Sequence, residues 1–199
     1  MTAAFAPVPV PLVKAYRLLN HGPVTLVSTA HEGRSNVMAA SWAMPLDFDP
    51  PKVVVVVDKS TLTRQLMEAS GEFALSLPAR QLAAEVVKAG SLSGKELKDK
   101  QTDKWAATGL DNFPAEKIAA PLVAGCVGWL ECRIIDEPRN QQQYDLFIGE
   151  VVAAWADPRV FHDDHWVFDH ADERLRTLHY VAGGNFLVTG EAIHVDDVA

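Results

Sequence analysis

Five consecutive valines, Val53 to Val57, are the feature that most constrains the fold of this chain. The segment Lys52–Asp58 around them lacks polar–apolar alternation, so it predicts a strand that is buried on both faces. A hydroxyl-rich stretch follows directly, in which Ser60 or Thr61 can cap a helix over Thr61–Ala69. The pattern therefore places a buried strand immediately before the N-terminus of a helix.

The remaining segments predict several antiparallel strands and few helices. Val24–Ala30 and Asn36–Ser41 form a hairpin around a Glu32-Gly33 turn. Further elements are strands at Glu72–Leu77, Gly125–Asp136 and Gln143–Trp155, the last two joined by EPRNQQ, and an amphipathic helix at Ala79–Lys88. Because helices are inserted between strands without strict alternation, we expect a mainly β barrel with peripheral helices.

The length and composition of the chain fit one compact domain over residues 1–199, since 48% of its residues are hydrophobic. Prolines at positions 7, 9 and 11 make residues 1–12 an extended arm, and residues 13–19 can form a short helix. The tail, residues 157–199, is histidine-rich and predicted to be irregular, apart from the segment LHYVAGGNFLV. No internal repeat or linker divides the sequence.

Charge and motifs exclude several classes of protein. The formal net charge of -8 disfavours nucleic acid as a partner, because such binding depends on basic clusters. The N-terminus has no signal-peptide pattern, and no apolar run approaches the ~20 residues of a membrane span. The two cysteines lack zinc or redox spacing, and GxGxxG, Walker and GxSxG motifs are absent. We therefore expect a cytoplasmic protein with neither a membrane nor a nucleic-acid partner.

The residues on either side of the valine strand predict a two-ended ligand site. Small residues before it leave backbone amides open to a flat polar ring, and these are Ala39, Ala40 and Ser41. Hydroxyl residues after it crowd the positive end of a helix, which favours an anion, and these are Ser60, Thr61 and Thr63, with Lys59 and Arg64 adding charge. Flavin mononucleotide (FMN) has such a ring and such a phosphate. Tight strand packing and ordinary helix capping explain the same residues without a ligand.

Six pieces of sequence occur in a fixed order along the chain: PVTLVSTAHEGRSNVMAASW, DPPKVVVVVDKSTLTRQLMEASGEFALSLP, VVKAGSLSG, DKWAATGL, GWLECRI and LFIGEVVAAW. In this order the chain resembles the flavin reductase-like family of FMN-binding split barrels, in particular its flavoredoxin-like branch. The resemblance covers about Leu18 to Trp155, with a weaker match at LHYVAGGNF. One departure is SGKELKDKQTDKW, which is longer than the family pattern between its glycine and its DK pair.

The resemblance implies a six-stranded antiparallel Greek-key split barrel that forms a homodimer, with FMN near the subunit interface. Carried over residue by residue, it places the isoalloxazine ring and ribityl chain beside Asn36, Ala39, Ala40, Ser41 and Trp42. It places the phosphate at Ser60, Thr61 and Thr63, with Lys104 as a further contact. His179 and Tyr180 become candidates for the ring edge.

The function implied by the resemblance is that of an FMN-dependent oxidoreductase, either a flavin reductase or a flavoredoxin-like electron carrier. NADH or NADPH is the expected donor, and free flavin, a partner monooxygenase, or a metal or thiol compound is the acceptor. FMN carries the chemistry, so no catalytic side chain is predicted. Two alternatives stay open: a non-catalytic flavin-binding or sensor module, and a related barrel that uses a deazaflavin, pyridoxal phosphate or haem.

Three further features are assigned structural roles. The segment FHDDHWVFDH groups His162, His165 and His170 with aspartates, but it lacks a helical HExxH pattern, so we expect a solvated surface loop and no metal. Cys132, in a predicted strand, is expected to be a small buried apolar residue. Trp42 either stacks near the flavin or seals the barrel or the dimer.

Overall fold

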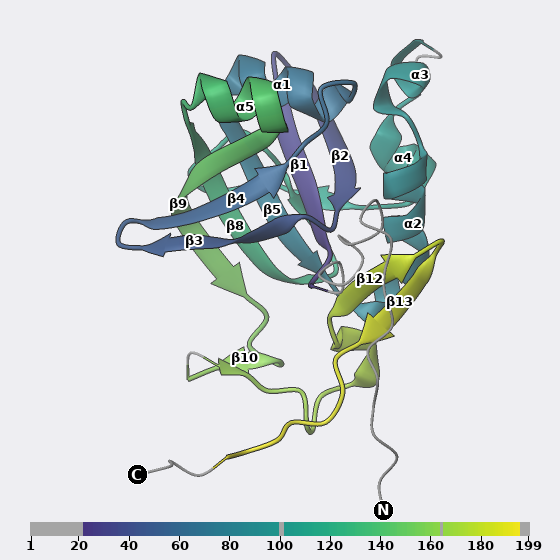
Figure 1. Cartoon of the computed structure of the whole chain (residues 1–199). Coiled ribbons are helices and arrows are strands. Elements are labelled where there is room, and N and C mark those ends of the chain that lie inside the picture. Colours follow the sequence, from purple (N-terminus) through teal and green to yellow (C-terminus); the bar gives the residue numbers. More distant parts are fainter. Residues whose placement is uncertain (1–21, 100–101, 164, 196–199) are drawn as a thin grey trace, which may run out of the picture.

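The computed structural model describes residues 22–99, 102–163 and 165–195, so the predicted arm at 1–12 and helix at 13–19 lie outside the described residues. Seven strands form one antiparallel sheet in the order β2-β1-β5-β8-β9-β4-β3 (Figure 1). Their bounds are β1 Thr25–His31, β2 Arg34–Ala40, β3 Ala43–Phe48, β4 Pro51–Val56, β5 Glu72–Pro78, β8 Cys126–Ile135 and β9 Leu146–Ala156.

The prediction of a mainly β antiparallel fold is confirmed, but the sheet has seven strands where six were expected. The unexpected strand is β3, which pairs only with β4 at the edge of the sheet. Five of its six residues are exposed, and its pairing is interrupted by a bulge between Pro45 and Asp47. A strand that buries no face shows no alternation, and so this one gives no sequence signal.

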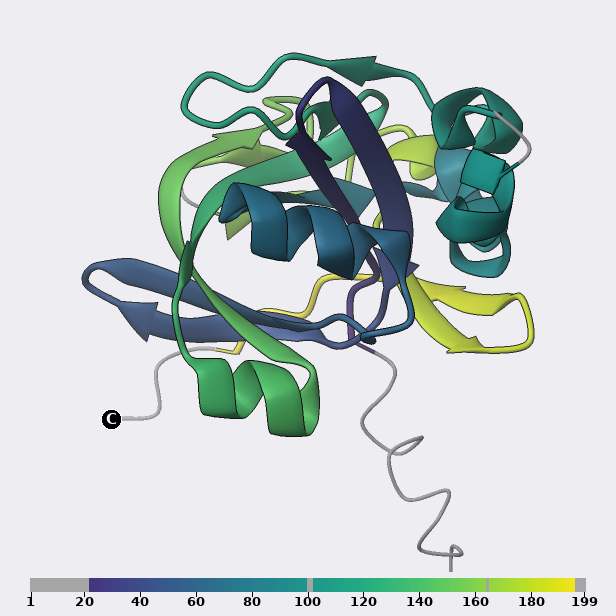
Figure 2. The same cartoon turned by 90° about the horizontal axis from the view of Figure 1, so that it is seen from above.

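The two ends of the sheet lie next to each other in sequence. Only Ser41 and Trp42 connect the edge strands β2 and β3, so the sheet must curl to bring its edges together. Viewed from above, the strands surround helix α1, Leu62–Ser70, which lies across this end of the curled sheet (Figure 2). Leu66 and Met67 on α1 are buried. The sheet is thus an open barrel with α1 as its plug.

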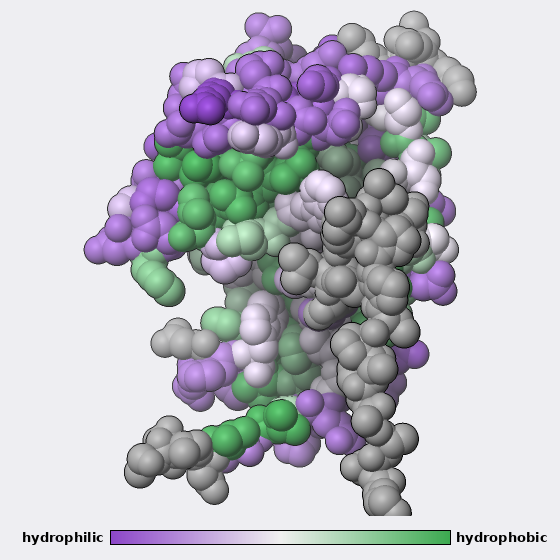
Figure 3. Space-filling model, in the orientation of Figure 1, coloured by the Kyte–Doolittle hydropathy of each residue, from purple (hydrophilic) through white to green (hydrophobic). Residues whose placement is uncertain are grey.

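The valine strand separates the barrel core from an apolar outer surface. Val53, Val55 and Val57 are buried in one cluster with Met67 and Phe73. The alternate residues point to the other face, where the side chains in a row across four strands are half-buried or exposed: Met44, Val54, Ile148 and Ile135. Figure 3 shows this outer surface as a broad apolar area over β4 and β9. The predicted burial of this strand is therefore confirmed for its inner face and is wrong for its outer face.

Helices cover one edge of the barrel. The other helices in the described part of the chain are the 3₁₀ turns η2 Arg80–Leu82 and η3 Glu173–Leu175, and the α-helices α2 Ala83–Ser91, α3 Gly94–Asp99, α4 Lys104–Thr108 and α5 Pro138–Tyr144. Helices α2, α3 and α4 form a column along β2 (Figure 1), and α2 and α4 pack directly on that strand. The EPRNQQ connection is mostly helical, as α5, because Pro138 occupies its first turn.

The C-terminal part of the chain contains a hairpin in the segment LHYVAGGNFLV, which was expected to be ordered, and one ribbon in the part predicted to be irregular. Two short ribbons form there, β10 Phe161–His162 with β11 His165–Trp166, and β12 Leu178–Ala182 with β13 Asn185–Val188. A third ribbon pairs β6 Asn112–Phe113 with β7 Leu122–Val123. The β12–β13 hairpin lies at the foot of the helix column (Figure 1). Among the described residues, no helix has the length and apolar character needed to span a membrane.

Candidate functional site

Three cavities follow strand β2 from one end to the other, on the side where α2, α3 and α4 stand. At its C-terminal end the aromatic cavity, of about 420 Å³, is lined by Ala39, Ala40, Ser41, Tyr180 and Phe186 together with α2 and Gly183-Gly184. In the middle the hydroxyl cavity, of about 240 Å³, contains Asn36, Ser60, Thr61, Thr63 and Lys104. At its N-terminal end the turn cavity, of about 330 Å³, is lined by Arg34, Ser35, Asn36, Asp103 and Lys104, among others.

Shared lining residues make the three cavities one cleft. Ala39, Gly90 and Ser91 line both the aromatic and the hydroxyl cavity. Asn36 and Lys104 line both the hydroxyl and the turn cavity. The cleft therefore runs from an apolar end with two aromatic rings, past a group of hydroxyls, to a polar end beside the β1–β2 turn.

The first turn of α1 and the residues before it line the hydroxyl cavity. Thr61 is the N-cap residue, as predicted: its hydroxyl accepts a hydrogen bond from the Arg64 N–H at 3.1 Å and donates one to the Asp58 carbonyl at 2.8 Å. Hydrogen bonds from the hydroxyl and the backbone N–H of Ser60 lower the pKa of Asp58. This turn is ordered by its own contacts, so its remaining N–H groups are preorganised for an acceptor.

Thr63 and Lys104 form the buried part of the hydroxyl cavity. The Asn36 amide donates a hydrogen bond of 2.7 Å to the Thr63 hydroxyl, which leaves that hydroxyl's hydrogen available. The Lys104 side chain belongs to a residue only 6% exposed, and it makes no ion pair or hydrogen bond with the residues that the structure describes. Burial lowers the pKa of Lys104 to about 8. A buried cation without a partner, beside a helix N-terminus, suits an anionic group.

Gly94 lies in the wall of the hydroxyl and turn cavities, at a position where a larger residue would collide with Asn36. A Cβ atom at this position would lie 2.8 Å from the Asn36 amide oxygen, closer than packed atoms approach. A glycine therefore lets the start of α3 come up against Asn36 and keeps the amide oriented toward Thr63.

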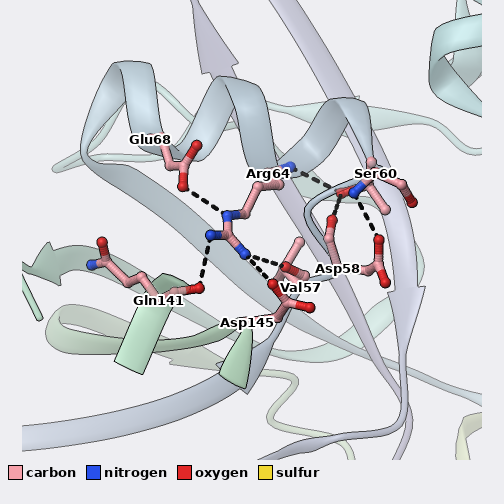
Figure 4. Close-up of polar contacts among 8 residues, drawn as sticks. Val57, Asp58, Ser60, Arg64, Glu68, Gln141 and Asp145 are labelled. Carbon is pink, nitrogen blue, oxygen red and sulfur yellow. Dashed lines mark hydrogen bonds and ion pairs between the residues drawn. The ribbon is translucent and has the colours of Figure 1, made fainter. Parts of the chain in front are cut away.

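Arg64 does not serve the anion site, contrary to the expectation from its position. Its guanidinium is buried and turned toward α5, where it donates to the Asp145 carboxylate at 2.7 Å and the Gln141 carbonyl at 2.8 Å (Figure 4). It also donates to Glu68 at 2.7 Å. Arg64 thus ties α1 to α5, and Lys104 is the cation that lines the hydroxyl cavity.

The structure gathers most of the predicted site residues along the cleft and leaves three outside it. Asn36, Ala39, Ala40, Ser41, Ser60, Thr61, Thr63, Lys104 and Tyr180 all line the aromatic or the hydroxyl cavity. Trp42 is half-exposed and Lys59 is exposed, and neither lines any of the three cavities. His179 also lines none of them, since neighbouring residues of a strand point to opposite faces and Tyr180 faces the cleft.

Sequence reasoning missed one wall of the cleft. This wall comes from α2 and the segment after it, and from the turn and outgoing strand of the last hairpin: Val86, Gly90, Ser91, Ser93, Gly94, Gly183, Gly184 and Phe186. The signal was present, because VVKAGSLSG and LHYVAGGNF are among the pieces that carry the family resemblance. Their small residues admit a ligand, but only the folded chain brings them opposite β2.

The histidine-rich segment and the cysteines lie apart from the cleft. His162 and His165 are exposed on the β10–β11 ribbon, and no group of three metal-ligating side chains occurs among the described residues. Cys132 is buried in the core, as predicted, and burial raises the pKa of its thiol to about 12.

Comparison with known proteins identifies the family. The flavin reductase-like domain model matches residues 17–184, so the chain belongs to that family, as its motifs predicted. The chain is 40% identical to the YddH protein of Escherichia coli K12 over 94% of this chain and 96% of that protein. An FMN-binding domain of flavin reductase-like enzymes from Shewanella baltica is 48% identical, with a TM-score of 0.83 over 95% of this chain and 97% of that one. Flavoredoxin of Desulfovibrio vulgaris is 27% identical, with a TM-score of 0.73 over 89% and 92% of the two chains.

Proposed function

We propose that this protein is an FMN-dependent oxidoreductase whose cofactor occupies the aromatic and hydroxyl cavities. The observation that carries the proposal is the buried, unpartnered Lys104 beside the first turn of α1, at one end of a cleft whose other end is apolar. An anionic phosphate belongs at the first end and a planar ring at the second. The FMN-binding domain of Shewanella baltica and flavoredoxin support the choice of FMN.

In this proposal, different residues of the chain bind the phosphate, the ribityl chain and the ring of FMN. Thr63, Lys104 and the N–H groups of the α1 turn hold the phosphate, while the β2 backbone from Asn36 to Ser41 follows the ribityl chain and the ring. Bound FMN supplies hydride and electron transfer. Tyr180 and Phe186, whose ring centroids are 5.5 Å apart, wall the ring end and limit the access of water.

NADH or NADPH is the proposed donor, and free flavin, a partner monooxygenase or another small acceptor receives the electrons. The protein contributes binding and orientation rather than a nucleophile. The buried thiols of Cys126 and Cys132 both have pKa values well above neutrality, so neither is a thiolate at pH 7.

A homodimer is proposed on the outer surface described above. Met44, Leu46 and Phe48 on β3 are exposed, Phe48 to 97%, and they continue the apolar row on β4 and β9. A contiguous apolar surface of this kind favours a protein partner. Trp42, half-exposed between the cleft and β3, is then placed at the junction of the cofactor site and the dimer.

Spectra and binding titrations test the function. The purified protein is expected to carry or take up FMN, seen by its visible absorption, and to bleach under anaerobic NADH or NADPH. Riboflavin is expected to bind more weakly than FMN, since each charge-assisted hydrogen bond to the phosphate contributes ~1.5–3 kcal/mol. Equal affinity for riboflavin would refute the phosphate assignment, and FMN binding without bleaching would indicate a non-catalytic flavin module.

A further inference from the structure

Lys104 carries a buried amine on the wall of the cleft. The residue is 6% exposed and lines both the hydroxyl and the turn cavity. The Trp105 indole donates a 2.9 Å hydrogen bond to the Ser35 hydroxyl, which ties α4 to β2. The Thr108 hydroxyl donates one of 2.8 Å to the Lys104 carbonyl, so the backbone of the lysine is fixed as well. The amine is therefore held at the cavity, without a partner among the residues that the structure describes.

An amine in this environment can react as well as bind anions. Burial lowers the pKa of Lys104 to about 8, so roughly a tenth of the free protein carries the neutral, nucleophilic amine at pH 7. An unperturbed lysine, with a pKa of about 10.4, is neutral in only about one molecule in 2,500 at that pH. The adjacent carboxylate, Asp103, is the N-cap of α4 and accepts a hydrogen bond from the Ala106 N–H at 3.3 Å.

We propose that Lys104 is an acylation site for acyl phosphates, which bind through their phosphate in the hydroxyl cavity of the flavin-free protein. The inference rests on the proposed function, because it takes from that function the position of the phosphate, at Thr63 and the first turn of α1. In an acyl phosphate, a single bridging oxygen separates the phosphorus from the carbonyl carbon. Binding of the phosphate at Thr63 therefore brings this carbon into the cavity that Lys104 lines.

The acyl group is transferred in one balanced step. The neutral amine of Lys104 attacks the carbonyl carbon, and a C–N amide bond forms while the C–O bond to the phosphate breaks. One proton of the amine leaves with the phosphate, so the products are N-acyl-lysine and hydrogen phosphate, and nothing is oxidised or reduced. The helix N-terminus favours the negative charge of the departing phosphate. The phosphate of FMN is an ester of a sugar alcohol and presents no carbonyl carbon to the amine.

Acylation of Lys104 and binding of FMN exclude each other. The amide has no charge for the FMN phosphate, and the acyl group adds volume to a cavity of about 240 Å³. The acylated protein is expected to bind FMN about tenfold more weakly or worse, because a charge-assisted contact is lost. Bound FMN in turn covers the amine, so the flavin-free protein is the form that reacts.

Acetyl phosphate is the probe, and peptide mass spectrometry measures the acetylation rate of each lysine in the flavin-free protein. Lys104 is expected to react at least about tenfold faster than Lys88, an exposed lysine of α2 that lines none of the three cavities. Inorganic phosphate and FMN are each expected to protect Lys104 and to leave Lys88 unchanged. With acetic anhydride, which has no phosphate, the preference for Lys104 is expected to fall by about fivefold or more.

A pair of variants tests the phosphate contact itself. Thr63→Ala is expected to lower the preference of acetyl phosphate for Lys104, whereas Thr63→Ser is expected to keep it, because serine retains the hydroxyl. Two results would overturn the proposal: equal acetylation of Lys104 and Lys88, or the same preference for Lys104 with acetyl phosphate and with acetic anhydride. Protection of Lys104 by inorganic phosphate but not by FMN would instead support the acylation site and refute the proposed function.

Discussion

The side-chain amide of Asn36 donates a 2.7 Å hydrogen bond to the hydroxyl of Thr63, and both side chains are buried. The contact joins the middle of β2 to the first turn of α1, two elements separated by β3 and β4 in the sequence. It fixes the distance between the strand that is proposed to follow the flavin and the helix start that is proposed to hold the phosphate. One hydrogen bond thereby sets the width of the proposed cofactor site.

Replacing Thr63 with alanine is expected to weaken FMN binding by about 1–2 kcal/mol, near the lower end of what one hydrogen bond to a charged group contributes. Riboflavin, which lacks the phosphate, is expected to lose much less. From the sequence, the position of Thr63 in the first turn of α1 predicts that the substitution has little effect on folding. The structure corrects this prediction, because Thr63 is buried and its loss leaves the Asn36 amide unpaired, which lowers the free energy of unfolding by about 1–3 kcal/mol. Fluorescence titration and thermal unfolding measure the two effects.

Thr63→Ser is the matched control, since it keeps the hydroxyl and is expected to retain FMN affinity. His165→Ala controls for the alternative site: it changes the exposed β10–β11 ribbon and is expected to leave both FMN binding and NADH oxidation unchanged, with or without a chelator. Loss of turnover in His165→Ala, or FMN affinity in Thr63→Ala equal to that of the parent, would contradict the site.

Most strands of the barrel could be predicted from the sequence because each of them buries one face. The hairpin around Glu32-Gly33 and the strand before α1 appear close to their predicted bounds, since turn chemistry and apolar runs determine both. Strand β3 and helix α5 gave no such signal, because β3 is exposed and only Gln141 of α5 is buried.

The sequence predicted the site residues that belong to a single element, but not the features that depend on contacts between distant parts of the chain. Thr61 and Thr63 were predicted from the helix start alone. The direction of the Arg64 side chain depends on Asp145, which lies 81 residues further along the chain. Lys104 came from the resemblance, and its burial without a partner follows only from the packing of α4 against β2. Sequence spacing could supply neither fact.

The affinity for FMN is expected to fall as the pH rises from about 7 to about 9. Burial lowers the pKa of Lys104 from 10.5 to about 8, so the free protein loses this charge above pH 8. In the proposed site the phosphate binds the charged form, so the loss is expected to approach about tenfold per pH unit above the pKa. Riboflavin affinity is expected to stay constant over the same range.

Lys104→Met separates this effect from general pH damage. Removing a buried, unpaired charge is expected to stabilise the flavin-free protein below pH 8, because the unfolded chain there solvates a cation that the folded chain buries. The same variant is expected to bind FMN more weakly at pH 7 and to show no pH dependence of that affinity. A pH profile in Lys104→Met that matches the parent would remove Lys104 from the phosphate site.

Arg64→Met is expected to destabilise the fold by about 3 kcal/mol, because it leaves the carboxylate of Asp145 and the carbonyl of Gln141 without their donor. The guanidinium also lies 4.8 Å from the centre of the Phe147 ring, and that contact is lost as well. Arg80→Ala, which breaks an exposed ion pair with Glu173, is the control and is expected to cost less than about 1 kcal/mol. Urea unfolding measures the free energy of unfolding of both variants. Equal decreases in the two would show that the Arg64 network does not hold α1 to α5.

Met44→Glu is expected to convert a dimer into a monomer. Met44 is 58% exposed in the single chain, so a glutamate there is solvated and should leave the monomer's fold and stability nearly unchanged. In a dimer formed through the row Met44, Val54, Ile148 and Ile135, the same carboxylate would be buried against an apolar partner surface, at a cost that association cannot offset.

Ile193→Glu, at a residue 88% exposed and outside the strands of that surface, is the matched control. Light scattering at micromolar concentration is expected to show a dimer for the parent and for Ile193→Glu, and a monomer for Met44→Glu. A monomeric parent that still binds FMN would separate the cofactor site from any dimer, since Trp42 and the cleft would then be complete within one chain.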